Sequence, residues 1–421
     1  MPKGMIINVG TGKERKDIAH AICVSIRNQN PDFVYFMVTK RTLEETYPYI
    51  KEDPVFKGLK WSDIKELEDE NDLEKIFEEC KKVIYELIKK GCPRNAIVAD
   101  FTAGTKAMSA GLVLAAIEKK IGILVYTVGE RNHEGRVITG TERIFSFEPN
   151  KIYVEELLKE AISSFNKLQF SSCIDCCEKA LSLIQEPNLQ NKLNFLKKLA
   201  TAYAAWDRFL IKESFEILCE ISQSDLPEQF KIKRNIELNK NILHKEKENN
   251  FCFERAVDLI ENARRRGEIE KKYDDGVARL YRALEYIAQV RIKEKNLYKK
   301  NVSTGQIDTE DIDVELLPDN LKNKYRMMID KDGKLRLGLS KSYELLNDCG
   351  DGVGKIFCQM QETFKKLLAM RNNSILAHGF NSISENNFRE IFQKTLEFVQ
   401  SVFPETEEMI KNLKFPQIKI D

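Results

Sequence analysis

Apolar runs of strand length alternate with amphipathic stretches over the first 150 residues of the chain. Short apolar runs are typical of strands buried on both faces of a parallel sheet, whereas apolar residues repeated every three to four positions predict helices. The expected strands are residues 5–9, 33–38, 96–99 and 121–128, and the expected helices are residues 17–28, 72–89 and 106–119. This alternation predicts a Rossmann-like, doubly wound parallel sheet, which residues 136–140 and 143–148 would close as an antiparallel hairpin.

Helical periodicity dominates the sequence after Pro149. Residues 153–184 and 193–218 resemble two helical hairpins of tetratricopeptide type. Within residues 273–295, one apolar helix face carries Val277, Leu280, Tyr281, Leu284, Ile287 and Ala288. Residues 298–320 contain an acidic, turn-rich insertion, and helices are expected to resume near Lys355. We expect an α/β plus all-α architecture with domains at 1–150, 151–250 (a helical linker) and 251–421.

The charge balance limits what the chain as a whole can bind. Lys and Arg number 67 against 66 Asp and Glu, for a net charge of +1, so nucleic acid could be held only by a local basic patch. The opening "MPKGMIINVGTG" is typical of a strand and turn, and no apolar run approaches the roughly 20 residues of a membrane helix. We expect a cytoplasmic protein without a membrane partner.

The ten cysteines do not predict a metal site. Cys173, Cys176 and Cys177 form a CxxCC group on a helical segment, but a zinc site would need a second ligand pair at suitable spacing. We therefore expect free core thiols, with no metal and no cofactor.

Two glycine-containing loops follow predicted strands. "VGTGK" spans residues 9–13 and "DFTAGTKAMS" spans residues 100–109. Each combines glycine, threonine and lysine, which allows close backbone approach, hydroxyl hydrogen bonds and neutralisation of a phosphate. Neither loop matches the P-loop or GxGxxG patterns, so a conventional NTPase or dehydrogenase is not favoured. From the residues alone, ligand loops and simple tight turns both remain open.

The stretch "RNNSILAHGF", residues 371–380, holds one of only four histidines. Seven residues advance a helix by about 700°, so Arg371 and His378 would lie on one face, about 10 Å apart along the axis. Gly379 is placed to end that helix. The spacing alone fits an ordinary surface pair as well as an active site.

The second loop carries a family resemblance. "DFTAGTKAMSAGLVLAA" resembles the D-x-TGGTK-x-M signature of CARF domains, the ligand sensors of type III CRISPR ancillary proteins, although Ala103 replaces the first glycine. "YTVGERNHEGRVITGTERI" and "AAWDRF" are similar to one CRISPR-associated branch. The resemblance implies a cyclic oligoadenylate activator bound across a homodimer axis. The implied ligand-binding residues are Gly10, Thr11, Gly12, Lys13, Thr39, Thr102, Ala103, Gly104, Thr105 and Lys106.

The segment from Arg371 to His378 is similar to the R-x(4 to 6)-H motif of HEPN ribonucleases, with Asn372 after the arginine as in many members. This resemblance implies that Arg371, Asn372 and His378 are catalytic, that cleavage needs no metal, and that the products are a 2',3'-cyclic phosphate and a 5'-hydroxyl. It also implies a composite site between two copies. The patch "ARRRGEIEKK", residues 263–272, would either attract single-stranded RNA or form a solvated helix end.

The sequence therefore predicts a CARF-HEPN endoribonuclease that cyclic oligoadenylate activates against single-stranded RNA in type III CRISPR antiviral defence. One alternative is a non-catalytic sensor or adaptor that meets another protein through the helical middle or the acidic insertion. Another is a CARF domain that degrades its own ligand.

Overall fold

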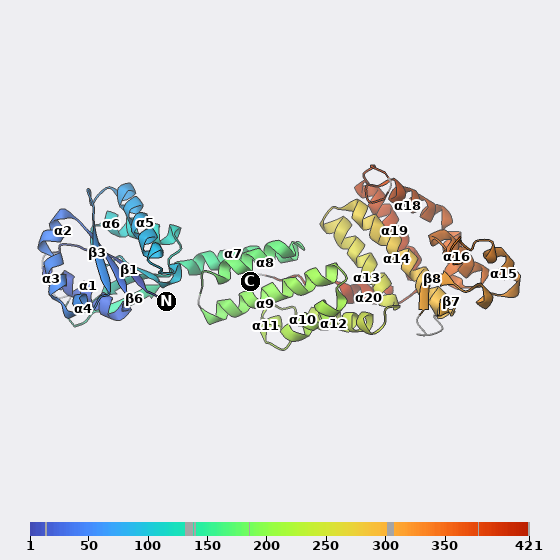
Figure 1. The fold of residues 1–421 in the computed structure, drawn as a ribbon, viewed down its shortest axis with the longest axis horizontal. Helices are drawn as coiled ribbons and strands as arrows, with labels where there is room; N and C mark the ends of the chain where they lie inside the picture. The colour runs from blue at the N-terminus through green and yellow to red at the C-terminus, as the bar shows by residue number, and fades with distance from the viewer. Residues whose placement is uncertain are drawn as a thin grey trace. The chain divides into compact units, whose positions relative to one another are not determined.

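The computed structural model describes residues 1–12, 15–130, 138, 140–184, 186–300, 307–377 and 379–419. The chain folds into two compact units. The first comprises Met1–Glu160 and Cys176–Asn194, and the second comprises Ala161–Asp175 and Phe195–Asp421. Figure 1 traces the order of their elements.

A six-stranded sheet forms the centre of the first unit. Its strands are β1 (Gly4–Asn8), β2 (Phe33–Val38), β3 (Trp61–Glu66), β4 (Ile97–Asp100), β5 (Ile123–Val128) and β6 (Arg143–Phe147). Their order is β3-β2-β1-β4-β5-β6; the first five are parallel, and β6 pairs antiparallel with β5. The predicted doubly wound fold is confirmed. Residues 136, 137 and 139 of the predicted hairpin lie outside the described residues.

Helices cover both faces of this sheet (Figure 1). The apolar side chains of α1 (Arg15–Gln29), α3 (Tyr47–Glu52) and α4 (Pro54–Lys57) pack against one face. Those of α5 (Leu73–Lys89) and α6 (Lys106–Glu118) pack against the other. The short α2 (Lys40–Glu45) follows β2. Strand residues buried on both sides explain the continuous apolar runs in the sequence.

The helical part of the chain begins at the end of β6. Its helices are α7 (Asn150–Asn166), α8 (Phe170–Leu181), α9 (Pro187–Asp207), α10 (Ile211–Ile221), α11 (Leu226–Gln229), α12 (Lys233–Glu248), α13 (Phe253–Arg264), α14 (Tyr273–Glu294), α15 (Asp319–Arg326), α16 (Leu339–Asp348), α17 (Gly352–Gln359), α18 (Gln361–Asn373), α19 (Glu385–Val402) and α20 (Thr406–Leu413). A π-helical turn, η2 (Arg265–Ile269), joins α13 to α14. Short 3₁₀ turns occur at η1 (Arg94–Ala96) and η3 (Val314–Leu316).

The segment between α14 and α17 differs from expectation. Part of the predicted turn-rich insertion forms a two-stranded antiparallel sheet of β7 (Tyr298–Lys300) and β8 (Ile307–Ile312). Helices return at Asp319 rather than near Lys355, because short helices with few apolar positions give a weak periodic signal. Among the described helices, none is long and apolar enough to span a membrane.

An aromatic core fixes α18 against its neighbours. The ring of Phe357 stacks on Tyr343 and Phe364 with centroid distances of 3.7 and 4.5 Å, and Phe398 meets all three edge-on. The Tyr343 hydroxyl donates to the backbone oxygen of Leu284 in α14 at 2.8 Å. This packing holds the end of α18 beside α14 (Figure 1).

Candidate functional site

Both glycine loops lie at the same edge of the sheet. "VGTGK" connects β1 to α1, and "DFTAGTK" connects β4 to α6. Strands β1 and β4 are neighbours, and their following helices cover opposite faces. This is the topological switch point of a doubly wound sheet, where ligands bind in the crevice beyond the strand ends.

The two loops approach each other at their glycines. A Cβ on Gly10 would lie 2.7 Å from the backbone nitrogen of Gly104 and 3.4 Å from the Cβ of Ala103. The buried methyl of Ala103 therefore sits beside the space that Gly10 leaves open. Gly104 has a φ of +97°, which favours glycine at that position. The departure from TGGTK is thus accommodated against the first loop.

Asp100, the last residue of β4, holds the second loop through hydrogen bonds. Its carboxylate accepts hydrogen bonds from the backbone amide and the hydroxyl of Thr102. The same hydroxyl accepts from the amide of Thr127 in β5 at 2.9 Å. Burial raises the pKa of Asp100, and the hydrogen bonds from Thr102 act in the opposite direction. Asp100 was not among the predicted ligand-binding residues, although it begins the CARF-like motif.

The predicted ligand residues differ in exposure. Gly12, Gly104 and Lys106 are exposed, Thr11 and Thr102 are half-buried, and Lys13 lies outside the described residues. Thr39 is buried, and its hydroxyl accepts from the amide of Thr42 as the N-cap of α2. The Thr105 hydroxyl caps α6 and also donates to the backbone oxygen of Glu70 at 2.6 Å. The exposed groups at the amino end of α6 can meet an anion directly.

The helix predicted to carry both Arg371 and His378 ends earlier than expected. α18 stops at Asn373, and Ser374 adopts an extended backbone conformation. The expectation of one continuous helix face is therefore wrong. The backbone amides of Ala377 and Gly379 both donate to the Ser374 oxygen, at 3.0 and 3.2 Å. A tight loop replaces the last predicted turn, and His378 itself lies outside the described residues.

Gly379 permits this loop to return to the helix. A Cβ there would lie 2.2 Å from the backbone oxygen of Asn373, and the amide of Asn381 donates to that oxygen at 3.0 Å. A side chain at position 379 would displace the loop. Gly379 was expected as a helix terminator, but its observed role is this close backbone contact.

Arg371 lies at the end of the buried face of α18. Phe364 and Leu367, seven and four residues earlier, are fully buried. The guanidinium carbon of Arg371 lies 4.8 Å from the ring centroid of Tyr281 in α14, and Nη1 donates to the Asn372 side chain at 3.1 Å. No carboxylate in the described parts of the chain pairs with Arg371. Its positive charge therefore remains available to an incoming anion.

Tyr281 is a site residue that periodicity placed only in the apolar face. Burial and a hydrogen bond with Glu285 raise the pKa of Tyr281 to about 12, so the ring stays neutral and electron-rich beneath Arg371. Because the contact joins residues 90 positions apart in sequence, no local signal indicated it.

The basic patch at residues 263–272 is not a free RNA surface. Arg265 is buried and pairs with Asp207 at 3.1 Å and Asp258 at 3.4 Å. Arg266 pairs with Asp207 and with Glu270. Carboxylates therefore neutralise Arg265 and Arg266, while Lys271 and Lys272 at the end of the patch are exposed, as expected for a solvated helix end.

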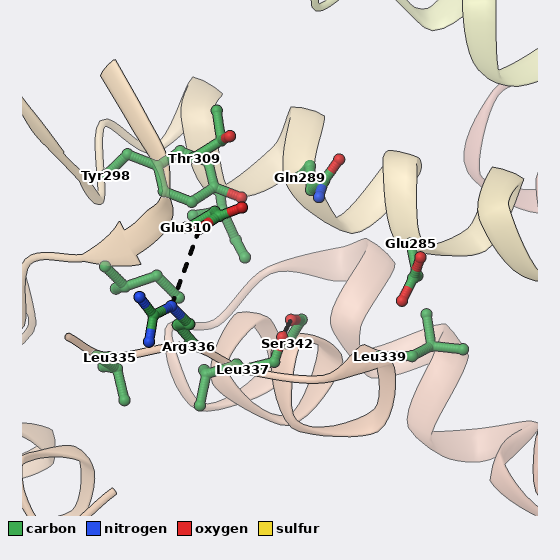
Figure 2. A pocket seen from close by; sticks show the side chains of 12 residues that line it. Glu285, Gln289, Tyr298, Thr309, Glu310, Leu335, Arg336, Leu337, Leu339 and Ser342 are labelled. Carbon is green, nitrogen blue, oxygen red and sulfur yellow. Dashed lines mark hydrogen bonds and ion pairs between the residues drawn. The ribbon is translucent and has the colours of Figure 1, made fainter. Parts of the chain in front are cut away.

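A cavity of about 290 Å³ lies along α14, near the β7–β8 hairpin and α16. Figure 2 shows Glu285 and Gln289 projecting from α14, with Arg336 paired to Glu310 on the other side. Arg336 also pairs with Asp330. This mixed charge makes the cavity a poor anion site. Among the described residues, no cluster of three His, Cys, Asp or Glu side chains could hold a metal, and the side chains of Cys173, Cys176 and Cys177 are buried.

Comparisons with known proteins agree with this arrangement. A model described as the Csm6 6H domain matches residues 153–252, and one described as the Csm6 HEPN domain matches residues 244–402, together more than half of the chain. Enterococcus italicus Csm6 bound to cyclic hexa-2'-fluoro-hexa-dAMP shares the fold, with 15% identity, a TM-score of 0.61 and 98% of each chain covered. A type III CRISPR defence DNA nuclease activated by cyclic oligoadenylate matches at 14% identity over 48% of this chain and 34% of that chain, with a TM-score of 0.25. None of the curated proteins compared matches.

Proposed function

This chain belongs to the Csm6 family, the CARF-HEPN ancillary nucleases of type III CRISPR systems that cyclic oligoadenylate activates, and from that membership we propose that it cleaves single-stranded RNA at Arg371. The observation that carries the proposal is the state of this arginine. It is held by Tyr281 and Asn372 and has no carboxylate partner within the described residues. An unneutralised guanidinium can bind the scissile phosphate bidentately.

The chemistry requires few groups because RNA carries its own nucleophile, the 2'-hydroxyl. Arg371 would stabilise charge on the phosphoryl oxygens, Asn372 would orient Arg371 or the substrate, and His378 would transfer a proton. Attack of the 2'-oxygen on phosphorus expels the 5'-oxygen, which takes up a proton. The products would be a 2',3'-cyclic phosphate and a 5'-hydroxyl, and no step uses a metal.

We propose that cyclic oligoadenylate binds the two loops at the switch point, through Gly10 to Lys13 and Thr102 to Lys106. The close contact between Gly10 and Gly104 makes the loops a single surface, and the amino end of α6 supplies backbone amides for phosphate. The domain limits 1–150, 151–250 and 251–421 would then correspond to sensor, linker and nuclease.

A homodimer would complete both sites. Apolar side chains are exposed in two places: on α5 and α6 of the first unit, and around the Arg371 segment of the second. They are Leu73, Leu114 and Ile117, and Ile375, Leu376 and Phe380. Clustered exposed apolar residues mark interaction surfaces, and a two-fold axis would place each patch against its own copy.

The test is RNA cleavage by the purified protein with and without cyclic tri-, tetra- or hexa-adenylate. We expect cleavage only with one of these ligands, a cyclic phosphate on the 5' product, no effect of EDTA, and loss of activity in Arg371→Ala and His378→Ala with unchanged ligand affinity. Cleavage retained by both variants refutes the assigned site. Ligand binding without any cleavage would favour the non-catalytic sensor.

Mixing protomers tests the composite site. In an equal mixture of wild-type and Arg371→Ala chains that exchange freely, activity should fall to about one quarter if each site needs both copies, and to about one half if each copy acts alone. A value of one half contradicts the shared site without affecting the assignment of Arg371.

A further inference from the structure

A second and larger cavity opens in the helical unit, away from the residues of Figure 2. It encloses about 750 Å³ between α10, α12, α13 and α14. Its lining contains five cationic side chains and a single acidic one. The cations are Lys212, Lys247, Arg255, Arg279 and Arg282, and the acid is Glu246.

We propose that this cavity is an RNA-binding exosite, which holds the phosphates of nucleotides flanking the one cut at Arg371. The inference rests on the proposed ribonuclease function and adds a second contact region for the same substrate. Single-stranded nucleic acid binds to grooves that combine cationic side chains with aromatic or apolar surface. Phe209, half-buried, contributes such a surface to the wall.

The charge of the cavity is not balanced on its own wall. Arg279 lies 3.4 Å from Asp275, and Arg282 lies 3.7 Å from Glu285, but neither carboxylate lines the cavity. Lys212 is exposed, and no ion pair to it occurs among the described residues. Partly exposed ion pairs at such distances contribute little free energy, so an RNA phosphate can replace the carboxylate as the partner of either arginine.

Glu246 does not offset these cations. Its side chain is fully buried, and neither of its carboxylate oxygens has a hydrogen-bond partner in the described structure. Burial and the nearby Asp258 raise the pKa of Glu246 well above its usual value, while Arg255 at 3.5 Å acts in the opposite direction. The neutral acid is therefore favoured, and the cavity keeps its positive charge.

The cavity lies within reach of the proposed cleavage site through α14. Tyr281, which contacts Arg371, is one residue from Arg282 and two from Arg279. At 1.5 Å per residue both arginines arise within about 3 Å of Tyr281 along the axis, on other sides of a helix about 10 Å across. A strand held at Arg371 needs only a few nucleotides to pass around α14 into the cavity.

RNA is favoured over an acidic protein because the proposed active site offers very little binding surface of its own. One guanidinium per chain can fix a phosphate but cannot hold a flexible strand. Five cations one helix width away supply that affinity without sequence preference.

The experiment measures binding of a fluorescent 12-nucleotide single-stranded RNA by anisotropy, using full-length protein with Arg371→Ala to prevent cleavage. The test variant adds Lys212→Gln and Lys247→Gln. The matched control adds Lys198→Gln and Lys233→Gln, which remove the same charge from lysines paired to Glu220 and Glu228 outside the cavity. Dissociation constants are measured between 50 and 200 mM salt.

Each lost phosphate contact should reduce the slope of log K against log salt by about 0.7 for a single strand. The test variant removes two such contacts, so the magnitude of its slope of log K against log salt should be smaller by about 1.4. At 0.1 M salt this change corresponds to about 25-fold weaker binding of RNA. The control should keep the slope of its parent. Because the altered lysines are solvent-facing, circular dichroism should show the same melting curve for all three proteins.

Three outcomes overturn the exosite. Equal slopes for test and control, with RNA still bound by the Arg371→Ala proteins and cleaved by the wild type, refute the inference alone. Loss of polyglutamate binding but not RNA binding in the test variant assigns the cavity to an acidic protein instead. No RNA binding by the parent, together with no cleavage by wild type, refutes the proposed function as well.

Discussion

Replacing Asp207 by alanine should destabilise the helical unit more than any exposed charge deletion. Asp207 ends α9, in the part matched to the 6H domain, and its partners Arg265 and Arg266 belong to the HEPN match. Its carboxylate also accepts from the Asn262 amide at 2.8 Å. The side chains of Asp207, Arg265 and Arg266 are only 10%, 7% and 14% exposed. Removing Asp207 leaves two buried cations without their shared anion.

The size of the loss follows from what each arginine retains. Arg265 keeps Asp258 at 3.4 Å and the Phe415 ring at 4.0 Å, and Arg266 keeps Glu270 at 2.6 Å. Breaking a buried ion pair usually lowers the free energy of unfolding by about 3–5 kcal/mol. Because both arginines keep other contacts, we expect Asp207→Ala to lose about 3 kcal/mol, the lower end of that range. At about 2–4 °C per kcal/mol, the melting temperature should fall by roughly 6–12 °C.

The assay is thermal unfolding followed by circular dichroism at 222 nm. Asp319→Ala is the matched control, because the side chain of Asp319 is 96% exposed and pairs only with nearby Lys322 in the described structure. That variant should melt within about 2 °C of wild type. If Asp207→Ala melts as the control does, the network does not hold the two matched regions together, and the argument from buried charge is refuted.

Two further predictions concern the sensor loops and the buried acid. Gly10→Ala should weaken binding of the activating cyclic oligoadenylate at least about tenfold in calorimetry, because its methyl meets the Gly104 backbone at 2.7 Å; Gly58→Ala, whose methyl meets only an ordinary contact at 3.5 Å, should bind normally. In urea unfolding, the free energy of unfolding of Glu246→Gln should increasingly exceed that of the wild type as the pH rises. The raised pKa of Glu246 means that the folded state keeps a proton which the unfolded chain loses above about 4.5, so wild-type stability falls with pH above that value. The difference should grow by at most about 1.4 kcal/mol per pH unit and vanish near pH 4; a constant difference contradicts the assignment.

Much of the first unit was predictable because its signals are local. Continuous apolar runs located β1, β2, β4 and β5, and the CARF-like motif indicated the second loop. The edge strand β3, "WSDIKE", was missed, since polar side chains alternate along an edge and weaken the strand signal. The family inferred from these motifs is confirmed by the Csm6 domain matches.

The second unit shows why local signals were insufficient there. Periodicity extended α18 through residue 378, but Asn373 is followed by a loop whose amides close on Ser374. The pattern R-x(6)-H survives this correction, because it depends on the motif and not on a helix face. The geometry between Arg371 and His378 cannot be derived from 3.6-residue spacing once the helix ends between them.

The arginines of this unit illustrate what only tertiary structure decides. "ARRRG" is the most conspicuous basic run in the region, yet Arg265 and Arg266 both form ion pairs with Asp207, which lies nearly 60 residues earlier in the sequence. Arg371, isolated in sequence, has no carboxylate partner among the described residues and rests on Tyr281. Cationic side chains without a carboxylate partner therefore occur in this unit at single positions on separate helices, and not in the basic run. For a protein with a net charge of +1, the distribution of carboxylates decides which arginines remain available to an anion.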